Sequence, residues 1–373
     1  MTVLKSFFEG KVVLITGHTG FKGSWLSLWL NYLGAKVVGV SKDIPTEPSN
    51  FGASFIKTEI DDRRLDILNF EDINNLVNEI QPDYVFHLAA QALVRPSYEY
   101  PLQTLLTNSI GTTNILESLR KLSKKVNVVM ITSDKVYDNL EWPWGYRETD
   151  RLGGKDPYSA SKAMAEMAIR TYVESYFKLE SDISLGIARA GNVIGGGDWA
   201  TDRIVPDCIK AWSVNKIVDI RNPEATRPWQ HVLEPLSGYL SLAINLSTNS
   251  VTNGQSYNFG PDGNQNYSVR QLIENMSDFW ANVRWNDASN DTKHLHEAGL
   301  LKLNCDKALN DLSWLPTLKF DETVRMTVEW YKEYYQNADE LNNFNMFEFS
   351  ITQIKEYHKL ATQRDLSWTK TID

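Results

Sequence analysis

The feature that most constrains the fold lies near the N-terminus, where a strand, a glycine loop and a helix are expected in direct succession. Residues 11–16 (KVVLIT) are rich in β-branched side chains and predict a buried strand. Residues 17–23 (GHTGFKG) form the loop, and the apolar pattern of residues 24–33 predicts the helix. Glycines at this spacing permit a tight turn and close backbone approach, so a pyrophosphate can bind at the helix N-terminus. This context predicts a dinucleotide site.

Further strands and helices alternate along the first half of the chain. Strands are expected at residues 36–40, 65–67 (the end of a third strand), 83–88, 126–131 and 183–188, and helices at residues 70–80, 103–121 and 158–176. The alternation predicts an α/β fold with a Rossmann-type, doubly wound parallel sheet that carries helices on both faces. Ligands of such sheets bind at the carboxyl ends of the strands.

Composition narrows the class of protein. The 373 residues carry a net charge of −9, whereas general nucleic-acid and membrane-surface binders usually present a basic face. The two cysteines, Cys208 and Cys305, are far apart and offer neither a disulfide framework nor metal-ligand spacing. The N-terminus lacks a signal-peptide layout, and the most apolar run, residues 25–33, is too short to span a bilayer. We expect a soluble, cytoplasmic protein that binds no metal, nucleic acid or membrane.

The residues after the second strand should select the adenosine end of the cofactor. An acid at this place usually binds the ribose hydroxyls and favours NAD. Here the acid is displaced to Asp43, and Lys42 could instead meet the 2′-phosphate of NADP. The alternative interpretation of Asp43 is a plain loop residue before Pro45. We expect NAD, held loosely because of this displacement and because His18 is bulky for a glycine loop.

Two further segments should border the same cofactor. Asp66, with Ile67, is placed to meet the adenine, and the small residues that end the fourth strand allow a nicotinamide ribose to lie close to the backbone. The residues expected to contact the cofactor are Gly17, His18, Gly20, Phe21, Gly23, Asp43, Asp66, Ile67, Leu88, Ala89, Ala90, Gln91, Thr132, Tyr158 and Lys162.

A tyrosine and a lysine four residues apart are the first candidate catalytic pair. Tyr158 and Lys162 share one face of the helix that begins at Pro157. An ammonium group near a phenol stabilises the phenolate and lowers its pKa towards that of a general base. The alternative is an amphipathic helix with a solvated lysine and a half-buried tyrosine. The predicted dinucleotide site earlier in the chain favours a catalytic role for the pair.

The segment directly after the fifth strand is the second candidate for a catalytic group. Thr132, Ser133, Asp134 and Lys135 follow one another there. A polar turn with an Asp–Lys contact would explain them. In a catalytic role, they would offer a hydrogen-bonding hydroxyl, a proton donor and a base beside the cofactor. Asp134 and Lys135 would then perturb each other's pKa.

The motifs GHTGFKG, HLAAQ, TSDKVY and YSASK, in this order, resemble the extended short-chain dehydrogenase/reductase family. The strings at residues 91–97 (QALVRPS), 151–163, 191–199 (GNVIGGGDW) and 227–240 resemble, more narrowly, its CDP-glucose 4,6-dehydratase group. The resemblance covers residues from about 11 to about 331. It implies an NAD-dependent lyase that converts CDP-glucose to CDP-4-keto-6-deoxyglucose and water, the entry step to dideoxy sugars of bacterial surface polysaccharide.

The resemblance also implies roles for the candidate catalytic residues. Tyr158 takes the proton of the sugar 4-hydroxyl, and Lys162 lowers its pKa and holds the nicotinamide ribose. Ser133 hydrogen-bonds the 4-oxygen. Asp134 is the acid for water loss and Lys135 the base at C5, where the related dTDP-sugar dehydratases have Asp-Glu.

Basic residues in the matched segments are expected to bind the substrate. Arginine forks suit phosphate oxygens, although a surface ion pair is the commoner fate of any one arginine. The expected substrate ligands, besides Ser133, are Arg95, Asn192, Arg203, Arg221 and Arg227.

We expect three parts of the chain and, by analogy with the family, a homodimer or tetramer. Residues 1–190, joined by about 228–250, form the Rossmann domain, residues 191–340 a smaller C-terminal, nucleotide-sugar-binding domain, and residues 341–373 an extension packed on the body. In the extension, Phe344 to Ile351 should form a packing strip and residues 352–360 a helix. Helices 103–121 and 158–176 would pair between two copies as a four-helix bundle. A nucleotide-sugar epimerase and a non-catalytic, dinucleotide-sensing protein remain as alternatives.

Overall fold

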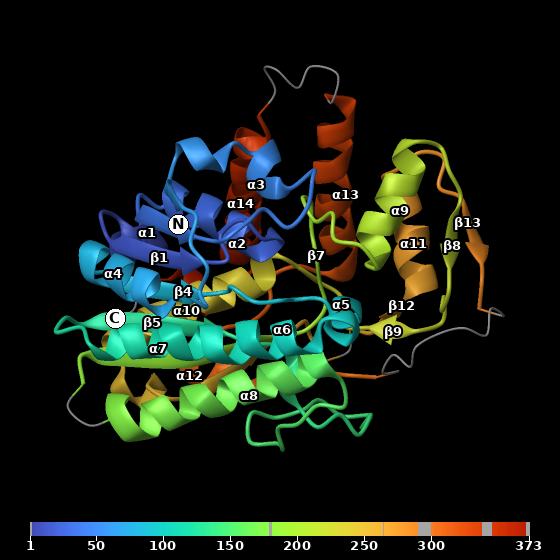
Figure 1. Ribbon diagram of the computed structural model, residues 1–373. Coiled ribbons are helices and arrows are strands. Elements are labelled where there is room, and N and C mark those ends of the chain that lie inside the picture. The colour runs from blue at the N-terminus through green and yellow to red at the C-terminus, as the bar shows by residue number, and fades with distance from the viewer. Residues whose placement is uncertain (1, 179–180, 264, 290–299, 338–344, 371–373) are drawn as a thin grey trace.

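Seven parallel strands form the central sheet of the computed structural model, which describes residues 2–178, 181–263, 265–289, 300–337 and 345–370 (Figure 1). The spatial order is β11–β6–β5–β4–β1–β2–β3, so the chain winds outward in both directions from β1. The strands are β1 (Val12–Thr16), β2 (Lys36–Val40), β3 (Asp61–Arg63), β4 (Tyr84–His87), β5 (Val126–Ile131), β6 (Ile183–Ala190) and β11 (Ser256–Phe259). The predicted doubly wound sheet is confirmed.

Helices cover both faces of this sheet. Leu14 of β1 belongs to one core, together with residues of α4 (Phe70–Ile80), α7 (Gly111–Arg120) and α8 (Pro157–Tyr172). Val13 and Ile15 belong to the other core, which α2 (Phe21–Tyr32) and α10 (Leu233–Thr248) cover. Alternate residues of a strand point to opposite faces, so a strand buried on both sides is apolar along most of its length, as Val12 to Ile15 of β1 are.

Three of the expected elements differ from the structure. The third strand was expected to end at residues 65–67, but β3 ends at Arg63 and is an edge strand with the charged sequence Asp61-Asp62-Arg63. The two long helices are each interrupted or extended by a π-helical turn. α6 (Pro101–Leu105) continues through Leu106–Ile110 into α7, and α8 continues into Val173–Phe177. Short 3₁₀ helices lie at residues 56–58, 134–136, 250–252 and 367–369.

A second layer of small elements lies to the right of the sheet in Figure 1. It contains α9 (Ile204–Ser213), α11 (Val269–Ser277) and the strand pairs β8–β13 and β9–β12. The strands are β8 (Val218–Ile220), β9 (Thr226–Arg227), β12 (Tyr267–Ser268) and β13 (Trp285–Asp287). The pair β7 (Val193–Ile194) and β10 (Gln230–His231) follows the exit of β6 and precedes α10. The remaining helices are α1 (Thr2–Phe8), α3 (Asn50–Ala53), α5 (Val94–Glu99), α12 (Asp306–Leu312), α13 (Phe320–Gln336) and α14 (Met346–Gln363).

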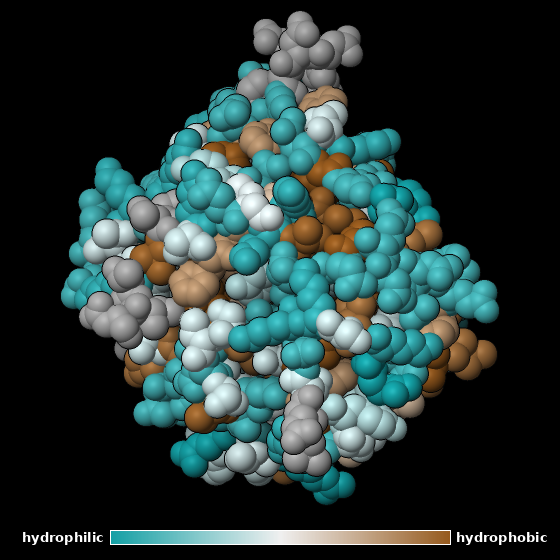
Figure 2. Space-filling view, turned by 90° about the vertical axis from the view of Figure 1, so that its left-hand side faces the viewer, coloured by the Kyte–Doolittle hydropathy of each residue, from teal (hydrophilic) through white to brown (hydrophobic). Residues whose placement is uncertain are grey.

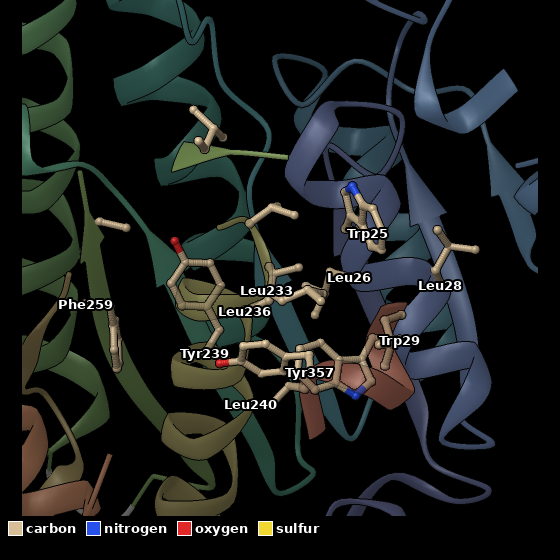
Figure 3. Close-up of a cluster of buried hydrophobic side chains, with 14 of the residues drawn as sticks. Trp25, Leu26, Leu28, Trp29, Leu233, Leu236, Tyr239, Leu240, Phe259 and Tyr357 are labelled. Carbon is tan, nitrogen blue, oxygen red and sulfur yellow. The ribbon is translucent and has the colours of Figure 1, made fainter. Parts of the chain in front are cut away.

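The C-terminal helix α14 packs against α2, and its contacts reach α10. Trp29 of α2 meets Tyr357 of α14 edge to face, with ring centroids 5.7 Å apart (Figure 3). Tyr357 Oη donates to the buried carboxylate of Glu234 on α10 at 2.8 Å. The expected strip and helix are one element, since α14 begins at Met346; Phe344 lies outside the described residues. Figure 2 shows a face that is mostly hydrophilic with small hydrophobic patches. No helix in the described ranges is long and apolar enough to cross a membrane.

Candidate active site

The glycine loop and the end of β4 lie against each other at the carboxyl edge of the sheet. Gly17 has φ +78°, and a Cβ atom there would lie 2.7 Å from the backbone nitrogen of Ala89. A Cβ atom at Gly23 would lie 2.0 Å from the carbonyl oxygen of Gly17. Thr16 Oγ1 accepts the Ala89 N–H at 3.3 Å and lies 2.7 Å from His87 Nδ1. The loop is therefore compact, and only glycine fits at these two positions.

His18 turns its ring into the protein. Its Nε2 lies 2.8 Å from Asp62 Oδ1 and its Nδ1 3.1 Å from Ser41 Oγ. The ring fills the space beside Gly39, where a Cβ atom would come within 2.4 Å of it. Burial lowers the pKa of His18, against the opposing effect of the hydrogen bond with Asp62. His18 therefore joins the glycine loop to β3.

The acid that meets the glycine loop is Asp62, which the sequence analysis missed. Its carboxylate is largely buried and also accepts from Arg64 Nη2 at 2.9 Å. The side chain of Asp43 is exposed, and its carbonyl oxygen accepts from Thr19 Oγ1 at 2.7 Å. A ribose-binding role for Asp43 stays a prediction. The signal for Asp62 was hidden because the third strand was placed too late in the sequence.

Asp66 and Ile67 follow β3 in a tight turn. Asp66 Oδ1 accepts the Leu68 N–H at 3.0 Å, and Asn114 Nδ2 donates to the Ile67 carbonyl oxygen at 2.9 Å. Both residues thus stand at the carboxyl edge of the sheet, as expected for adenine contacts, which stay a prediction.

Tyr158 and Lys162 lie in the first two turns of α8. Asp156 caps this helix, since its Oδ1 accepts the Ser159 N–H at 2.9 Å, and Pro157 occupies the first turn. The side chains of Tyr158 and Lys162 are both buried, with 7% of each residue exposed. Four-residue spacing on a buried helix face thus brings both groups to the same edge of the sheet.

The pKa values of this pair differ from the expectation. Burial raises the pKa of Tyr158 to about 12, while a hydrogen bond with Ser133 and the charge of Arg203 lower it in part. Burial also lowers the pKa of Lys162 to about 8. The expected net lowering of the phenol's pKa is therefore not what the structure shows. Desolvation, which disfavours the charged form of both groups, is the larger effect.

Ser133, Asp134 and Lys135 begin a short turn after β5. Ser133 Oγ donates to Asp134 Oδ1 at 3.0 Å and accepts the Lys135 N–H at 3.2 Å. Burial raises the pKa of the Asp134 carboxyl, and the charges of Lys135 and Lys22 oppose this shift. A carboxyl group with a raised pKa can hold the proton that a general acid must deliver. Thr132 precedes this turn, and its Oγ1 is buried without a hydrogen-bond partner among the described residues.

Lys22 is a second residue that the sequence analysis missed. It stands in the first turn of α2. Burial and, to a lesser extent, the charges of Arg203 and Lys162 lower the pKa of its ammonium group to about 8, whereas the charge of Asp134 raises it. The motif GHTGFKG contained the residue, but the direction of its side chain is fixed only by the turn at the start of α2.

Asn108 is the third missed residue, and it supports the site from the π-helical turn. Its Oδ1 accepts the Gln91 N–H at 2.8 Å, and its Nδ2 donates to the Gln91 carbonyl oxygen at 3.0 Å and to Ser161 Oγ at 2.8 Å. It thus fixes residues 88–91, with Leu88 and Ala90, relative to the Tyr158 helix. A buried Asn inside an apolar helical pattern was the available signal.

The candidate substrate arginines are not all brought together. Arg203 Nη1 donates to Asp198 Oδ2 at 2.6 Å, and its charge acts on Tyr158. Arg95 and Arg221 both bind Asp202, at 2.6 and 3.4 Å, in a more exposed group.

The other two candidate ligands lie on the loops after β6. Arg227 is in β9 and donates to the Thr226 carbonyl oxygen at 2.8 Å. Asn192 has an exposed side chain, and its carbonyl oxygen accepts the Gln230 N–H at 3.3 Å. A cavity of about 270 Å³ opens beside this region, with Gly191 and Gln230 among its lining residues. Gly191 adjoins the turn of residues 133–135, since a Cβ atom there would lie 3.1 Å from Asp134 Oδ2.

A doubly wound sheet with a glycine loop opposite a buried Tyr–Lys pair is the arrangement of extended short-chain dehydrogenases/reductases, as the motifs suggested. Within that class, the model of the GDP-mannose 4,6-dehydratase family matches residues 14–327. The chain belongs to this family.

Known proteins similar to this chain include a close relative and more distant structures. The chain is 45% identical over 366 residues to the CDP-glucose 4,6-dehydratase of Salmonella typhimurium, a match that covers 96% of this chain and 99% of that protein. Two solved structures share the fold. The dTDP-glucose 4,6-dehydratase of Bacillus anthracis in complex with NAD has a TM-score of 0.72 at 21% identity, covering 89% of this chain and 100% of that one. The UDP-glucuronic acid 4-epimerase of Bacillus cereus has a TM-score of 0.73 at 23% identity, covering 87% and 100%.

Proposed function

We propose that the protein converts CDP-D-glucose to CDP-4-keto-6-deoxy-D-glucose and water, with NAD as the bound hydride carrier. The observation that carries this proposal is the 45% identity, over nearly the whole of both chains, to the Salmonella CDP-glucose 4,6-dehydratase. Asp134 and Lys135 beside Tyr158 supply the two extra groups that dehydration requires beyond oxidation.

NAD fits the geometry at the carboxyl edge of the sheet. The bare backbone at Gly17 and Gly23 leaves room for a pyrophosphate over the N-terminus of α2. The unpartnered Thr132 Oγ1 gives the ligand one more polar atom to meet. We assign the adenosine end to residues 66–67 and the nicotinamide end to residues 88–91, Tyr158 and Lys162.

In the first half of the reaction, Tyr158 takes the proton from the sugar 4-hydroxyl. When bound here, NAD would supply the hydride acceptor for oxidation at C4 and the hydride donor for reduction at C6. Tyr158 must be a phenolate to act as base, and the hydrogen bond with Ser133 and the positive charge of Arg203 favour this form. Ser133 holds the 4-oxygen by a hydrogen bond while its charge changes.

In the second half, the 4-ketone acidifies the C5 hydrogen. Lys135 removes this proton, and Asp134 protonates the departing C6 oxygen so that water leaves. The raised pKa of the buried Asp134 supports the role of acid. We further infer that Arg203 binds the diphosphate with Arg227, that Asn192 binds the sugar or phosphate, and that Arg95 and Arg221 form the outer rim of the site.

The test is incubation of the purified protein with CDP-glucose and NAD, followed by mass spectrometry of the nucleotide sugar. Loss of one water identifies the dehydratase. An epimerase would give a product of unchanged mass, and a dinucleotide-sensing protein would give no product; either result would refute the proposal.

We also infer the division of the chain that the motifs suggested. Residues 1–190 with about 228–250 would bind NAD, residues 191–340 would bind the nucleotide sugar, and residues 341–373 would brace the body. Two facts bear on this division. The strand β11 belongs to the main sheet although it lies within residues 191–340, and α14 packs on α2. Limited proteolysis with and without CDP-glucose would test whether residues 191–340 are protected as a unit.

A homodimer through α6–α7 and α8 is supported by apolar side chains exposed on these packed helices. Leu102, Met164 and Met167 are 69%, 50% and 56% exposed, and Leu106 and Ile110 are also exposed. Light scattering should therefore give a dimer or tetramer mass. Met164→Glu with Met167→Glu should give monomers, whereas Val251→Glu, at another exposed apolar residue, should not. A monomeric native protein would contradict this inference.

Two expectations complete the proposal. We infer that the protein works in the cytoplasm, where nucleotide sugars are made, at the entry to the dideoxy sugars of bacterial surface polysaccharide. We also expect NAD to dissociate readily, so that dialysed protein needs added NAD for full activity. Protein that stays fully loaded after dialysis, or that prefers NADP, would contradict the second expectation.

A further inference from the structure

Four aromatic rings form a continuous stack that runs from the segment after β5 to the protein surface. Tyr137, three residues after Asp134, stacks on Tyr146 with ring centroids 5.1 Å apart. Tyr146 stacks on Trp142 at 5.3 Å, and Trp142 lies against Trp144 at 5.5 Å. Tyr137 and Tyr146 are each 1% exposed, whereas Trp144 is 60% exposed. The stack therefore ends on an indole ring that is open to a ligand.

The backbone on which Trp144 stands is held in place by the segment that precedes α12. The Tyr146 N–H donates to the Lys302 carbonyl oxygen at 2.8 Å, and the Tyr146 carbonyl oxygen accepts the Asn304 N–H at 2.9 Å. At Gly145, directly after Trp144, a Cβ atom would lie 2.6 Å from the Asn304 nitrogen, so the two segments touch. An aromatic side chain on a fixed backbone loses little conformational freedom when it contacts a ligand.

Trp144 borders the cavity of about 270 Å³ that Gly191 also lines. Gly191 connects this cavity to the proposed chemistry, because a Cβ atom there would lie 3.1 Å from Asp134 Oδ2. A water molecule occupies about 30 Å³ in the liquid, so a cavity of this size has room for a hexosyl group. Its lining combines apolar residues such as Leu303 with polar residues such as Asn304. It thus offers both kinds of contact that a sugar ring makes.

We propose that Trp144 is a substrate-contacting residue, whose indole face stacks on the hexosyl group of the nucleotide sugar in this cavity. The inference rests on the proposed reaction, which puts C6 of the hexose at Asp134. A face of a pyranose ring that carries C–H bonds packs on an indole as an apolar surface does, while its hydroxyl groups can bond to the polar lining. The cytosine is separated from the hexose by the ribose and the diphosphate, and we therefore assign the cavity to the hexose.

Binding of CDP-glucose and of CDP tests the proposal, because CDP lacks only the hexosyl group. Calorimetry in saturating NADH, which cannot accept a hydride, measures both Kd values without turnover. Trp144→Ala should raise the Kd for CDP-glucose about tenfold, as truncation of a tryptophan contact commonly does. The Kd for CDP should stay within about twofold, as for a surface substitution that touches no ligand. Trp144→Phe keeps an aromatic face and should give a smaller rise for CDP-glucose.

A matched control and steady-state kinetics complete the test. Leu140 is 53% exposed in the same segment and does not line the cavity, so Leu140→Ala should leave both Kd values within about twofold of the native ones. With NAD, Trp144→Ala should raise KM for CDP-glucose about tenfold and change kcat by less than about threefold. The reason is that a stacking contact holds the substrate and the transition state alike.

The outcomes separate this inference from the proposed function. A native Kd for CDP-glucose in Trp144→Ala overturns the role of Trp144. An equal rise for CDP also overturns it, since the ring would then contact the nucleotide or support the fold. An equal rise for CDP-glucose in Leu140→Ala overturns it too, because the shape of the segment and not the indole would matter. A native protein that binds CDP-glucose without releasing water refutes the proposed dehydration instead, and the comparison of Kd values still tests the contact of Trp144.

Discussion

Removing the charge of Glu166 should destabilise the protein far more than the loss of a surface ion pair. Glu166 of α8 and Arg189 of β6 have fully buried side chains, with 2.8 Å between Nη2 and Oε1. Arg189 also donates to Tyr137 Oη at 2.6 Å and to the Glu148 carbonyl oxygen at 3.1 Å, so it cannot turn away towards solvent. Loss of one partner of a buried pair costs about 3–5 kcal/mol, because the other charge stays buried without compensation. For Glu166→Gln, which keeps the shape and one hydrogen-bonding oxygen, we expect about 3 kcal/mol.

Urea unfolding followed by tryptophan fluorescence measures this change. The matched control is Glu9→Gln, which breaks an exposed pair with Lys5 at 3.3 Å and should cost at most about 0.5 kcal/mol. The double variant Glu166→Leu with Arg189→Met removes both charges and should recover much of the lost stability. If Glu166→Gln unfolds within about 0.5 kcal/mol of the native protein, the charge of Glu166 does not compensate that of Arg189.

Three further predictions concern the candidate active site and the buried Glu234 of α10. Tyr158→Phe should lower turnover by about two to four orders of magnitude while CDP-glucose still binds, as steady-state kinetics and calorimetry would show. The variants Asp134→Asn and Lys135→Met should still form the 4-keto sugar and NADH but should not lose water. The absorbance of enzyme-bound NADH should therefore rise on addition of CDP-glucose and persist. In the Lys135 variant, solvent deuterium should not enter C5. Burial raises the pKa of Glu234 to about 7. Between the ordinary pKa of a glutamate side chain and about pH 7, the folded state then binds more protons than the unfolded state. The free energy of unfolding should therefore decrease as the pH rises through this range. In Glu234→Gln this decrease should be smaller.

The sheet and most helices could be predicted because their residues face water on one side or on none. β2 and α4 have the expected bounds, since a continuous apolar run and an apolar face of period 3.6 are unambiguous patterns. The edge strand β3 has neither of these patterns. Its residues are charged and partly exposed, as is common where a sheet must not pair with another chain, so no apolar run marked it. The four-residue spacing of Tyr158 and Lys162 gave their shared helix face directly.

The missed residues share a different cause. Asp62 and Asn108 contact residues far away in the sequence, His18 for one and Ser161 for the other. No local pattern of period 2 or 3.6 reports such a contact, because it depends on how strands are ordered in the sheet. The net direction of a pKa shift is equally non-local. Lys162 was expected to lower the pKa of Tyr158, but the depth of burial, which only the packed structure fixes, has the larger effect.

Helix α8 and the turn after β5, which carry the proposed catalytic residues, are joined by the buried hydrogen-bond network that includes Glu166. Glu166 stands one helical turn after Lys162, so the face of α8 that carries the candidate base continues into the core as a carboxylate. Arg189 donates hydrogen bonds to this carboxylate and to the hydroxyl group of Tyr137, which lies three residues after Asp134. Tyr137 Oη in turn donates to Asn258 Oδ1 at 2.8 Å on β11. Tyr158 on α8 and Asp134 after β5, the proposed proton acceptor and proton donor, are thus held in register by charged hydrogen bonds between the elements that carry them. A buried ion pair contributes little net stability compared with apolar residues of the same shape, but its directional bonds fix α8 and the turn after β5 relative to each other.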